Sequence, residues 1–305
     1  MYFRFSMENI LVTGGTGLVG SHLKRFLPDA EYISSKDFDL TLESDVRTLF
    51  ERKWDRVIHL ANRVGGILEN IDHPGEFIEE NLLMNTLLLK YARIQGSRRF
   101  TAVLSTCVYP DKFESYPMTE QALHQGPPQE TNFAYAISKI ALAVQIDSYN
   151  KQYSLDYNYL IPSNLYGEHD RIDFQRSHFV TALLGKILEA RKDRASSIHL
   201  LGTGSPLRQF LYADDLCRVI KICVERDLTE SFNVAPDENL SIREIAELAV
   251  EVCADGMLAI EFDNESPDGQ FRKDVSNEKM KRLIGEFEFT SLREGISKVY
   301  SRYSE

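Results

Sequence analysis

The sequence has few cysteines and no long hydrophobic run. Its four cysteines, Cys107, Cys217, Cys223 and Cys253, form no CxxC pair, so the pattern predicts neither a zinc site nor a disulfide framework. No stretch approaches the ~18 apolar residues of a membrane span, and the opening residues are too short and too mixed for a secretory signal. We therefore expect a cytoplasmic protein with reduced thiols and no metal.

Basic residues are also scarce relative to acidic ones. The chain contains 35 Lys and Arg against 46 Asp and Glu, which gives a formal net charge of −11. Nucleic acids and anionic membranes require a basic face, so neither is an expected partner. A substrate that carries phosphate would need positive side chains gathered locally.

Short apolar segments alternate with helical ones through the first half of the chain. The expected strands are brief and β-branched or aromatic, as in a parallel sheet buried on both faces; they cover 9–15, 30–34, 56–61, 100–106 and 157–162. Helical periodicity is found at 18–27, 77–95 and 133–153. This alternation predicts an α/β protein with a Rossmann-type doubly wound parallel sheet.

The second half of the chain is less regular. Helices are expected at 178–191, 241–253 and 292–303, and a strand at 198–202. We interpret residues 1–165 as a dinucleotide-binding domain, to which later parts of the chain can return. Residues 166–305 then form mainly a smaller α/β lobe that binds substrate.

A glycine loop follows the first expected strand. Gly14, Gly17 and Gly20 fit GxxGxxG, in which glycines allow a tight turn and close approach of a pyrophosphate to a helix. At the end of the second strand, Ser35 and Lys36 offer a hydroxyl and a cation that suit a ribose 2′-phosphate. These residues favour NADP(H), while the nearby Asp37 and Asp39 leave NAD as an alternative.

Tyr135 and Lys139 lie four residues apart on an expected helix, so both side chains emerge from one face. At that distance the ammonium is expected to favour the ionised phenol, which could then exchange a proton with a substrate oxygen. Ser105 ends the fourth strand and would reach the same oxygen. The three residues together predict reduction of a carbonyl by hydride from a nicotinamide.

Several words of the sequence resemble the extended short-chain dehydrogenase/reductases that act on nucleotide sugars. The matching words lie between Asn9 and Lys273 and include GGTGLVGSHL, HLANRVGGI, STCVYPDK, GPPQETNFAYAISK, IPSNLYGEHD, GTGSPLRQFLYADDL and SPDGQFRK. The resemblance implies an NADPH-dependent homodimer that epimerises carbons 3 and 5 of a GDP-bound 4-keto sugar and then reduces carbon 4.

The resemblance also implies roles for individual residues. Ser105, Tyr135 and Lys139 would form the reductase triad, and Cys107 and His178 the pair that moves protons during epimerisation. The implied cofactor contacts are Gly14, Gly15, Thr16, Gly17, Leu18, Val19, Gly20, Ser35, Lys36, Lys139, Pro162, Asn164, Leu165 and His178. The implied substrate contacts are Lys186, Leu201, Arg208, Asp268 and Lys273, with Arg272 as a further candidate.

The chain also departs from the family pattern. Thr16 replaces an arginine that bacterial members often carry, Leu201 replaces a common tryptophan, and EHDRID, with Glu168, replaces the usual PHDNFD. These departures keep two alternatives open. One is a reductase of a related GDP-4-keto sugar, such as a heptose or the colitose precursor; the other is a nucleotide-binding protein without turnover.

Overall fold

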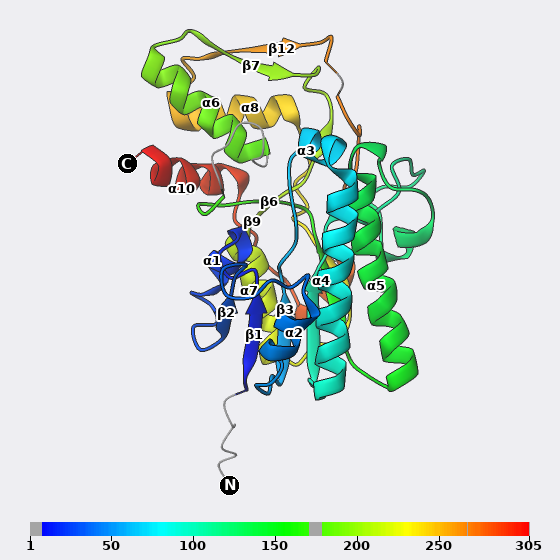
Figure 1. Ribbon diagram of the computed structural model, residues 1–305. Coiled ribbons are helices and arrows are strands. Elements are labelled where there is room, and N and C mark those ends of the chain that lie inside the picture. Colours follow the sequence, from blue (N-terminus) through cyan, green and yellow to red (C-terminus); the bar gives the residue numbers. More distant parts are fainter. Residues whose placement is uncertain (1–7, 171–178, 267, 305) are drawn as a thin grey trace.

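A six-stranded parallel sheet forms the centre of the larger part of the molecule. The computed structural model describes residues 8–170, 179–266 and 268–304. The strands are ordered β10-β5-β4-β3-β1-β2 and all neighbours are parallel (Figure 1). They cover Ile10–Thr13 (β1), Glu31–Ile33 (β2), Arg56–His59 (β3), Arg99–Val103 (β4), Asn158–Pro162 (β5) and Phe232–Val234 (β10).

Helices cover both faces of this sheet and bury a separate apolar cluster on each face. The first layer contains Glu43–Leu49 (α2), Pro74–Gln95 (α4) and Phe133–Tyr153 (α5). The second contains Leu18–Leu23 (α1), Ala213–Glu225 (α7) and Glu278–Ile284 (α9). The predicted doubly wound fold is therefore confirmed.

The first helix is shorter than the sequence predicted. The helix expected over 18–27 ends at Leu23, and the chain continues in turns up to Pro28. A residue before proline is disfavoured in helical conformation, which limits the helix from this side. The sheet also takes its sixth strand, β10, from the second half of the chain, because α7 carries the chain back beside α1. The division at residue 165 stays a prediction.

A smaller lobe lies beyond the carboxyl ends of the strands (Figure 1). Its core is a third apolar cluster, formed mainly by three helices and a parallel strand pair. The helices are Phe179–Asp193 (α6), Ile242–Ala254 (α8) and Leu292–Ser304 (α10), and the strands are Ser197–Leu201 (β7) and Ala259–Asp263 (β12).

Short elements join the sheet to this lobe. They pair as β6 with β9 and as β8 with β11. Their bounds are Asn164–Tyr166 (β6), Leu207–Arg208 (β8), Phe210–Tyr212 (β9) and Leu240–Ser241 (β11). The helix Ile67–Asp72 (α3) and the 3₁₀ turns Thr106–Val108 (η1), Glu120–His124 (η2) and Glu130–Asn132 (η3) complete the described elements.

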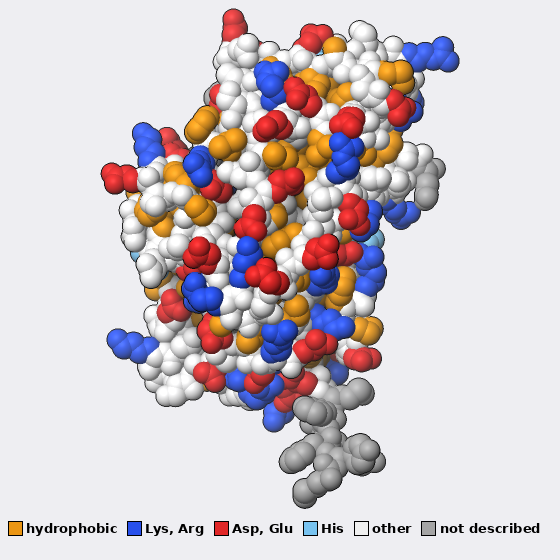
Figure 2. Space-filling view, turned by 180° about the vertical axis from the view of Figure 1, so that it is seen from behind, with side chains coloured by type: hydrophobic (Ala, Val, Ile, Leu, Met, Phe, Trp, Pro, Cys, Tyr) orange, Lys and Arg blue, Asp and Glu red, His pale blue; other side chains and the backbone are white. Residues whose placement is uncertain are grey.

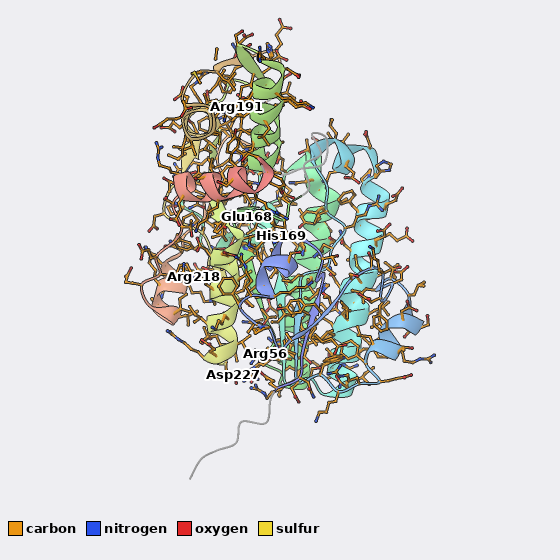
Figure 3. All side chains as sticks on the ribbon, turned by 90° about the vertical axis from the view of Figure 1, so that its left-hand side faces the viewer. Arg56, Glu168, His169, Arg191, Arg218 and Asp227 are labelled. Carbon is orange, nitrogen blue, oxygen red and sulfur yellow. The ribbon has the colours of Figure 1, made fainter. Side chains whose placement is uncertain are left out.

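An ion cluster closes the opposite, amino edge of the sheet. Arg56 is only 1% exposed and donates to Asp227, which also accepts from Arg98 and Arg99; Figure 3 shows Arg56 and Asp227 together. Burial would raise the pKa of Asp227, but hydrogen bonds from the three guanidinium groups outweigh it and hold the pKa at about 2. The cluster therefore joins strands β3 and β4 to the end of α7.

Charges elsewhere on the surface are mixed. On the face in Figure 2, acidic and basic side chains are interspersed and no large area has one sign. Across the described part of the chain, the helices are all too short or too polar to cross a membrane.

Candidate active site

The glycine loop follows β1 at the carboxyl edge of the sheet. Gly14 has a φ of +74°, and a Cβ on it would lie 2.8 Å from the backbone nitrogen of Ala61. A Cβ on Gly20 would lie 2.2 Å from the carbonyl oxygen of Gly14. Strand, loop and helix α1 therefore pack at distances that only glycine permits. Thr16 and Gly17 are exposed above this turn, so the loop fits the pyrophosphate of a dinucleotide.

The turn after β2 presents two of the predicted cofactor residues. Ser35 and Lys36 are exposed, whereas the carboxylate of Asp37 accepts hydrogen bonds from both the backbone nitrogen and the hydroxyl of Ser34, each 2.8 Å long. The Ser34 side chain is the largest cause that lowers the pKa of Asp37. Because Asp37 holds the turn, Ser35 and Lys36 are the groups of this turn that remain open toward a ribose.

Helix α5 places Tyr135 and Lys139 next to the end of β4. The Lys139 ammonium donates to the carbonyl oxygen of Val103 at 2.6 Å and lies 5.9 Å from the centre of the Tyr135 ring. Burial lowers the pKa of Lys139 to about 7. This helix therefore delivers both predicted side chains to the carboxyl edge of the sheet.

The electrostatics of Tyr135 differ from the sequence expectation. Burial raises the pKa of the phenol, and the neighbouring Cys107 adds to this effect. The expected lowering of the Tyr135 pKa by Lys139 was wrong, because burial of the phenol disfavours the phenolate and raises the pKa. Tyr135 consequently keeps its proton at neutral pH, which is the state that a proton donor to a carbonyl requires.

Ser105 and Cys107 occupy the turn directly after β4. The Ser105 hydroxyl caps the 3₁₀ turn η1 by accepting a hydrogen bond of 3.3 Å from the backbone nitrogen of Cys107. The same turn therefore carries a hydroxyl and a thiol, and the thiol lies close enough to Tyr135 to interact with it electrostatically. The Cys107 sulfur accepts a further hydrogen bond from the amide of Asn132 at 3.2 Å.

Two cations from distant parts of the chain lie around Cys107. The Lys273 ammonium is 3.9 Å from the sulfur, and the Arg208 guanidinium is close enough to interact electrostatically with both groups. Burial lowers the pKa of Lys273, and Arg208 adds to this effect while Cys107 opposes it. The thiol therefore lies beside one amide donor and two basic side chains.

This arrangement adds Asn132 to the candidate site. Lys273, which the resemblance assigns to substrate binding, lies beside the thiol, and its role in substrate binding stays a prediction. Asn132 was missed, although it stands in the NFAYAISK word only three residues before Tyr135. A polar residue at the start of the helix that carries Tyr135 was the available signal.

The remaining predicted substrate residues are more scattered. Leu201 is 73% exposed at the end of β7. The Asp268 carboxylate accepts hydrogen bonds from the backbone nitrogen and hydroxyl of Thr203, at 2.6 and 2.7 Å. The Lys186 ammonium donates to the carbonyl oxygen of His199 at 2.6 Å, so it contacts β7 and not the thiol.

Arg272 and His178 are the remaining candidate residues. Arg272 forms an ion pair with Asp274 and lies over the ring of Tyr116, 4.8 Å from its centre; its charge is already matched. His178 lies outside the described residues, and its role stays a prediction.

The segment after β5 also lies at the carboxyl edge of the sheet. Pro162 ends β5, and Asn164 begins β6, where its backbone nitrogen and side-chain amide both donate to the carbonyl oxygen of Gln209, at 3.2 and 2.9 Å. These bonds hold Leu165 and its neighbours at the carboxyl edge of the sheet. Ligands of open α/β sheets bind at this edge.

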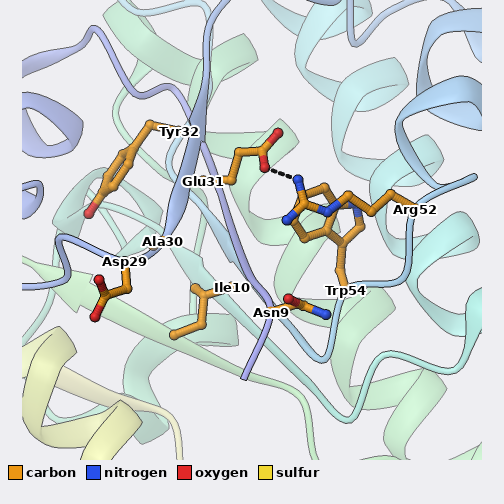
Figure 4. A pocket seen from close by; sticks show the side chains of 8 residues that line it. All are labelled: Asn9, Ile10, Asp29, Ala30, Glu31, Tyr32, Arg52 and Trp54. Carbon is orange, nitrogen blue, oxygen red and sulfur yellow. Dashed lines mark hydrogen bonds and ion pairs between the residues drawn. The ribbon is translucent and has the colours of Figure 1, made fainter. Parts of the chain in front are cut away.

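A surface pocket lies well away from these groups. It is lined by residues at the amino ends of β1 and β2, together with Arg52 and Trp54. Figure 4 shows the Arg52 guanidinium over the indole of Trp54, with an ion pair to Glu31. Since this pocket opens at the edge opposite Tyr135 and Cys107, it is not part of the candidate active site.

The glycine loop, Ser105, Tyr135 and Lys139 meet at one sheet edge, and this combination defines a dinucleotide-dependent oxidoreductase of the short-chain type. Comparison with known sequences agrees: the profile of the NAD dependent epimerase/dehydratase family matches residues 10–235. The chain belongs to this family.

Individual relatives resemble the chain along nearly its whole length. The GDP-L-fucose synthase of Dictyostelium discoideum is 34% identical, over 95% of this chain and 93% of that protein. The GDP-L-colitose synthase of Yersinia pseudotuberculosis is 32% identical, over 95% and 96%. A crystal structure of a GDP-L-fucose synthetase from Naegleria fowleri bound to NADP superposes with a TM-score of 0.89 at 32% identity, covering 98% of this chain and 93% of that one.

Proposed function

We infer that the chain converts GDP-4-keto-6-deoxy-D-mannose to GDP-L-fucose, by NADPH-dependent epimerisation at carbons 3 and 5 and reduction at carbon 4. The observation that carries this inference is the position of Cys107 beside Ser105 and Tyr135, in a chain that resembles GDP-L-fucose synthases from end to end. A plain reductase needs no such thiol, whereas epimerisation also needs a group that exchanges a proton with carbon.

The residues of the sheet edge fit the cofactor. The loop from Gly14 to Gly20, in which a Cβ on Gly14 or Gly20 would meet backbone atoms, would hold the pyrophosphate, while Ser35 and Lys36 would bind the 2′-phosphate. Pro162, Asn164 and Leu165 would lie at the nicotinamide end. When bound, NADPH supplies the hydride that the reduction requires.

Epimerisation requires the chain to move protons at carbons next to a keto group. Loss of a proton from carbon 3 or 5 leaves an enolate, which the hydroxyls of Ser105 and Tyr135 stabilise by hydrogen bonds. The Cys107 sulfur exchanges one of these protons while Asn132 and Lys273 hold it in place. His178 is proposed for the opposite face of the sugar, where inversion requires a second group.

Reduction then uses the same hydroxyls. The Tyr135 phenol, kept protonated by its burial, gives its proton to the oxygen on carbon 4. Lys139, fixed by the carbonyl of Val103, lies next to the phenol and offsets the charge that forms on it. Arg208 is proposed for the substrate diphosphate, with Leu201, Asp268 and Lys186 at the outer part of the substrate site.

A charge reversal at Lys36 tests the cofactor assignment. The Lys36→Glu variant is expected to bind NADPH about 10- to 100-fold more weakly, because it loses a charge-assisted hydrogen bond to the 2′-phosphate and gains a repulsion. Its affinity for NADH should change little. Isothermal titration with both dinucleotides measures this, and Lys112→Glu, an exposed lysine elsewhere, serves as the matched control. Unchanged NADPH affinity in Lys36→Glu would remove the support for this assignment.

We also propose a homodimer that pairs α4 and α5 of two subunits. The two helices lie side by side (Figure 1) and expose apolar side chains, with Leu83 42%, Ile94 58%, Val144 46% and Tyr153 40% accessible. Light scattering should give twice the chain mass for the protein and a single mass for Val144→Glu. Leu42→Glu, 50% exposed outside these helices, is the control and should remain dimeric. A monomeric wild-type protein would contradict the proposal.

A related GDP-4-keto sugar is the second candidate substrate, since the colitose synthase of Yersinia pseudotuberculosis is nearly as similar as the fucose synthases. A panel of GDP-4-keto-6-deoxymannose, a GDP-4-keto-heptose and the colitose precursor separates the candidates when NADPH oxidation is followed and products are identified by NMR. We expect GDP-L-fucose from the first. No oxidation with any sugar would favour a binding protein without turnover.

A further inference from the structure

A buried histidine lies behind the glycine loop, outside the candidate active site. His22 is on helix α1, two residues after Gly20, and its side chain is 0% exposed. Its Nδ1 lies 2.6 Å from the Asp214 carboxylate at the start of α7, and its Nε2 lies 3.3 Å from the Glu168 carboxylate after β6. Each ring nitrogen therefore has a carboxylate beside it, and the Arg25 guanidinium lies 3.0 Å from Nδ1 as well.

The backbone after β6 packs directly against this imidazole. A Cβ added to Gly167 would lie 2.7 Å from the His22 Nε2. The rings of His169 and Tyr212 meet the imidazole edge to face, with centres 5.0 and 5.9 Å away. Figure 3 shows Glu168 and His169 between the short helix α1 and helix α10. No space is left for the ring to move without moving the chain after β6.

Other contacts hold the same stretch from the side of the smaller lobe. The Tyr212 hydroxyl donates to the Glu168 carboxylate, and the Tyr303 hydroxyl donates to the Glu168 carbonyl oxygen at 2.9 Å. Thr181 on α6 donates to the Asp170 carboxylate at 2.7 Å. Unlike these contacts, the contact with His22 connects the stretch to helix α1, which directly follows the glycine loop.

His22 thus stands between two segments that a dinucleotide must span. The glycine loop ends two residues before it, and Gly167, which it touches, is two residues after Leu165. The first segment is the proposed pyrophosphate site and the second the proposed nicotinamide site. We propose that His22 is a positioning residue that sets the distance between these two segments and thereby the affinity for the complete dinucleotide. This inference rests on the proposed NADPH dependence.

The experiment compares two ligands that differ only in the nicotinamide. In His22→Ala, removal of the ring leaves the two segments without a spacer. The resulting change in the distance between them is expected to weaken NADPH binding by about tenfold or more. The fragment 2′-phospho-ADP-ribose does not reach the second segment. Its affinity should therefore stay within about twofold of wild type, by the same reasoning. Isothermal titration of both ligands gives the two ratios.

Equal loss of both ligands would overturn the proposal, because His22 would then merely support the glycine loop. Unchanged NADPH affinity would overturn it as well. His199→Ala is the matched control: this histidine is exposed, pairs with Glu261 on the smaller lobe, and should leave both affinities unchanged.

A second variant covers the case in which His22→Ala does not fold. Glu168→Gln keeps the side-chain volume and an acceptor for Tyr212 but removes the charge that faces Nε2. We expect the same selective loss of NADPH affinity, about threefold, and equal affinities to wild type would contradict the role of His22. The variants can show this selective loss of NADPH affinity while the wild-type protein converts no GDP sugar. In that case the proposed reaction fails and the inference about His22 stands.

Discussion

The Tyr135→Phe variant is expected to lose reduction at carbon 4 by a factor of about 10²–10⁴, the usual contribution of a positioned general acid. The substitution removes a single hydroxyl from helix α5, so the fold should persist. Proton exchange at carbons 3 and 5 should continue at a measurable rate, because Cys107 and Ser105 remain. Steady-state NADPH oxidation measures the first effect, and NMR of the sugar in deuterated water measures the second.

The control for this variant is Tyr153→Phe on the same helix, a tyrosine 40% exposed at the far end of α5. It should retain full reductase activity. The raised pKa of Tyr135 gives a further expectation: the acid form is the active one for reduction, so ionisation of the phenol should not reduce the rate until the pH passes the ordinary value of about 10. Full reductase activity in Tyr135→Phe would mean that another group supplies the proton.

The Cys107→Ser variant is expected to slow epimerisation by about 10²–10⁴-fold, since a hydroxyl is a far poorer proton-exchanging group than a thiol near neutral pH. Asn132 can still donate to the oxygen, and the turn η1 keeps its cap from Ser105. Hydride transfer to carbon 4 of the unepimerised sugar should persist. The product would then be a GDP-sugar with the original configuration at carbons 3 and 5.

Loss of a thiol elsewhere provides the matched control for Cys107→Ser. Cys253 is 2% exposed within the core of the smaller lobe, so Cys253→Ala should lower stability slightly and leave epimerisation intact. Equal rates of epimerisation in Cys107→Ser and the wild-type protein would exclude the thiol as the group that exchanges the proton.

The sheet and the reductase residues were predictable because their signals are local. Short apolar strands before glycines and the four-residue spacing of Tyr135 and Lys139 depend on neighbours along the chain. The order of the strands was not predicted, and the return of β10 to the sheet depends on how α7 packs against α1.

The electrostatic partners could not be predicted in this way. Lys273 reaches Cys107 across 166 residues, and His22 reaches Asp214 across 192 residues. The sign of the pKa shift of Tyr135 was also missed. Helical spacing predicts that Tyr135 and Lys139 share one face of the helix, but it does not predict how deeply the phenol is buried. Long-range contacts and burial are properties of the folded chain and leave no periodic pattern in the sequence.

The most direct test of the whole account is one reaction in deuterated water. Purified protein is incubated with NADPH and freshly prepared GDP-4-keto-6-deoxymannose, and the product is analysed by NMR. The account predicts GDP-L-fucose with deuterium at carbons 3 and 5, formed by one chain. Reduction at carbon 4 without deuterium at these carbons would contradict it and leave a plain 4-reductase.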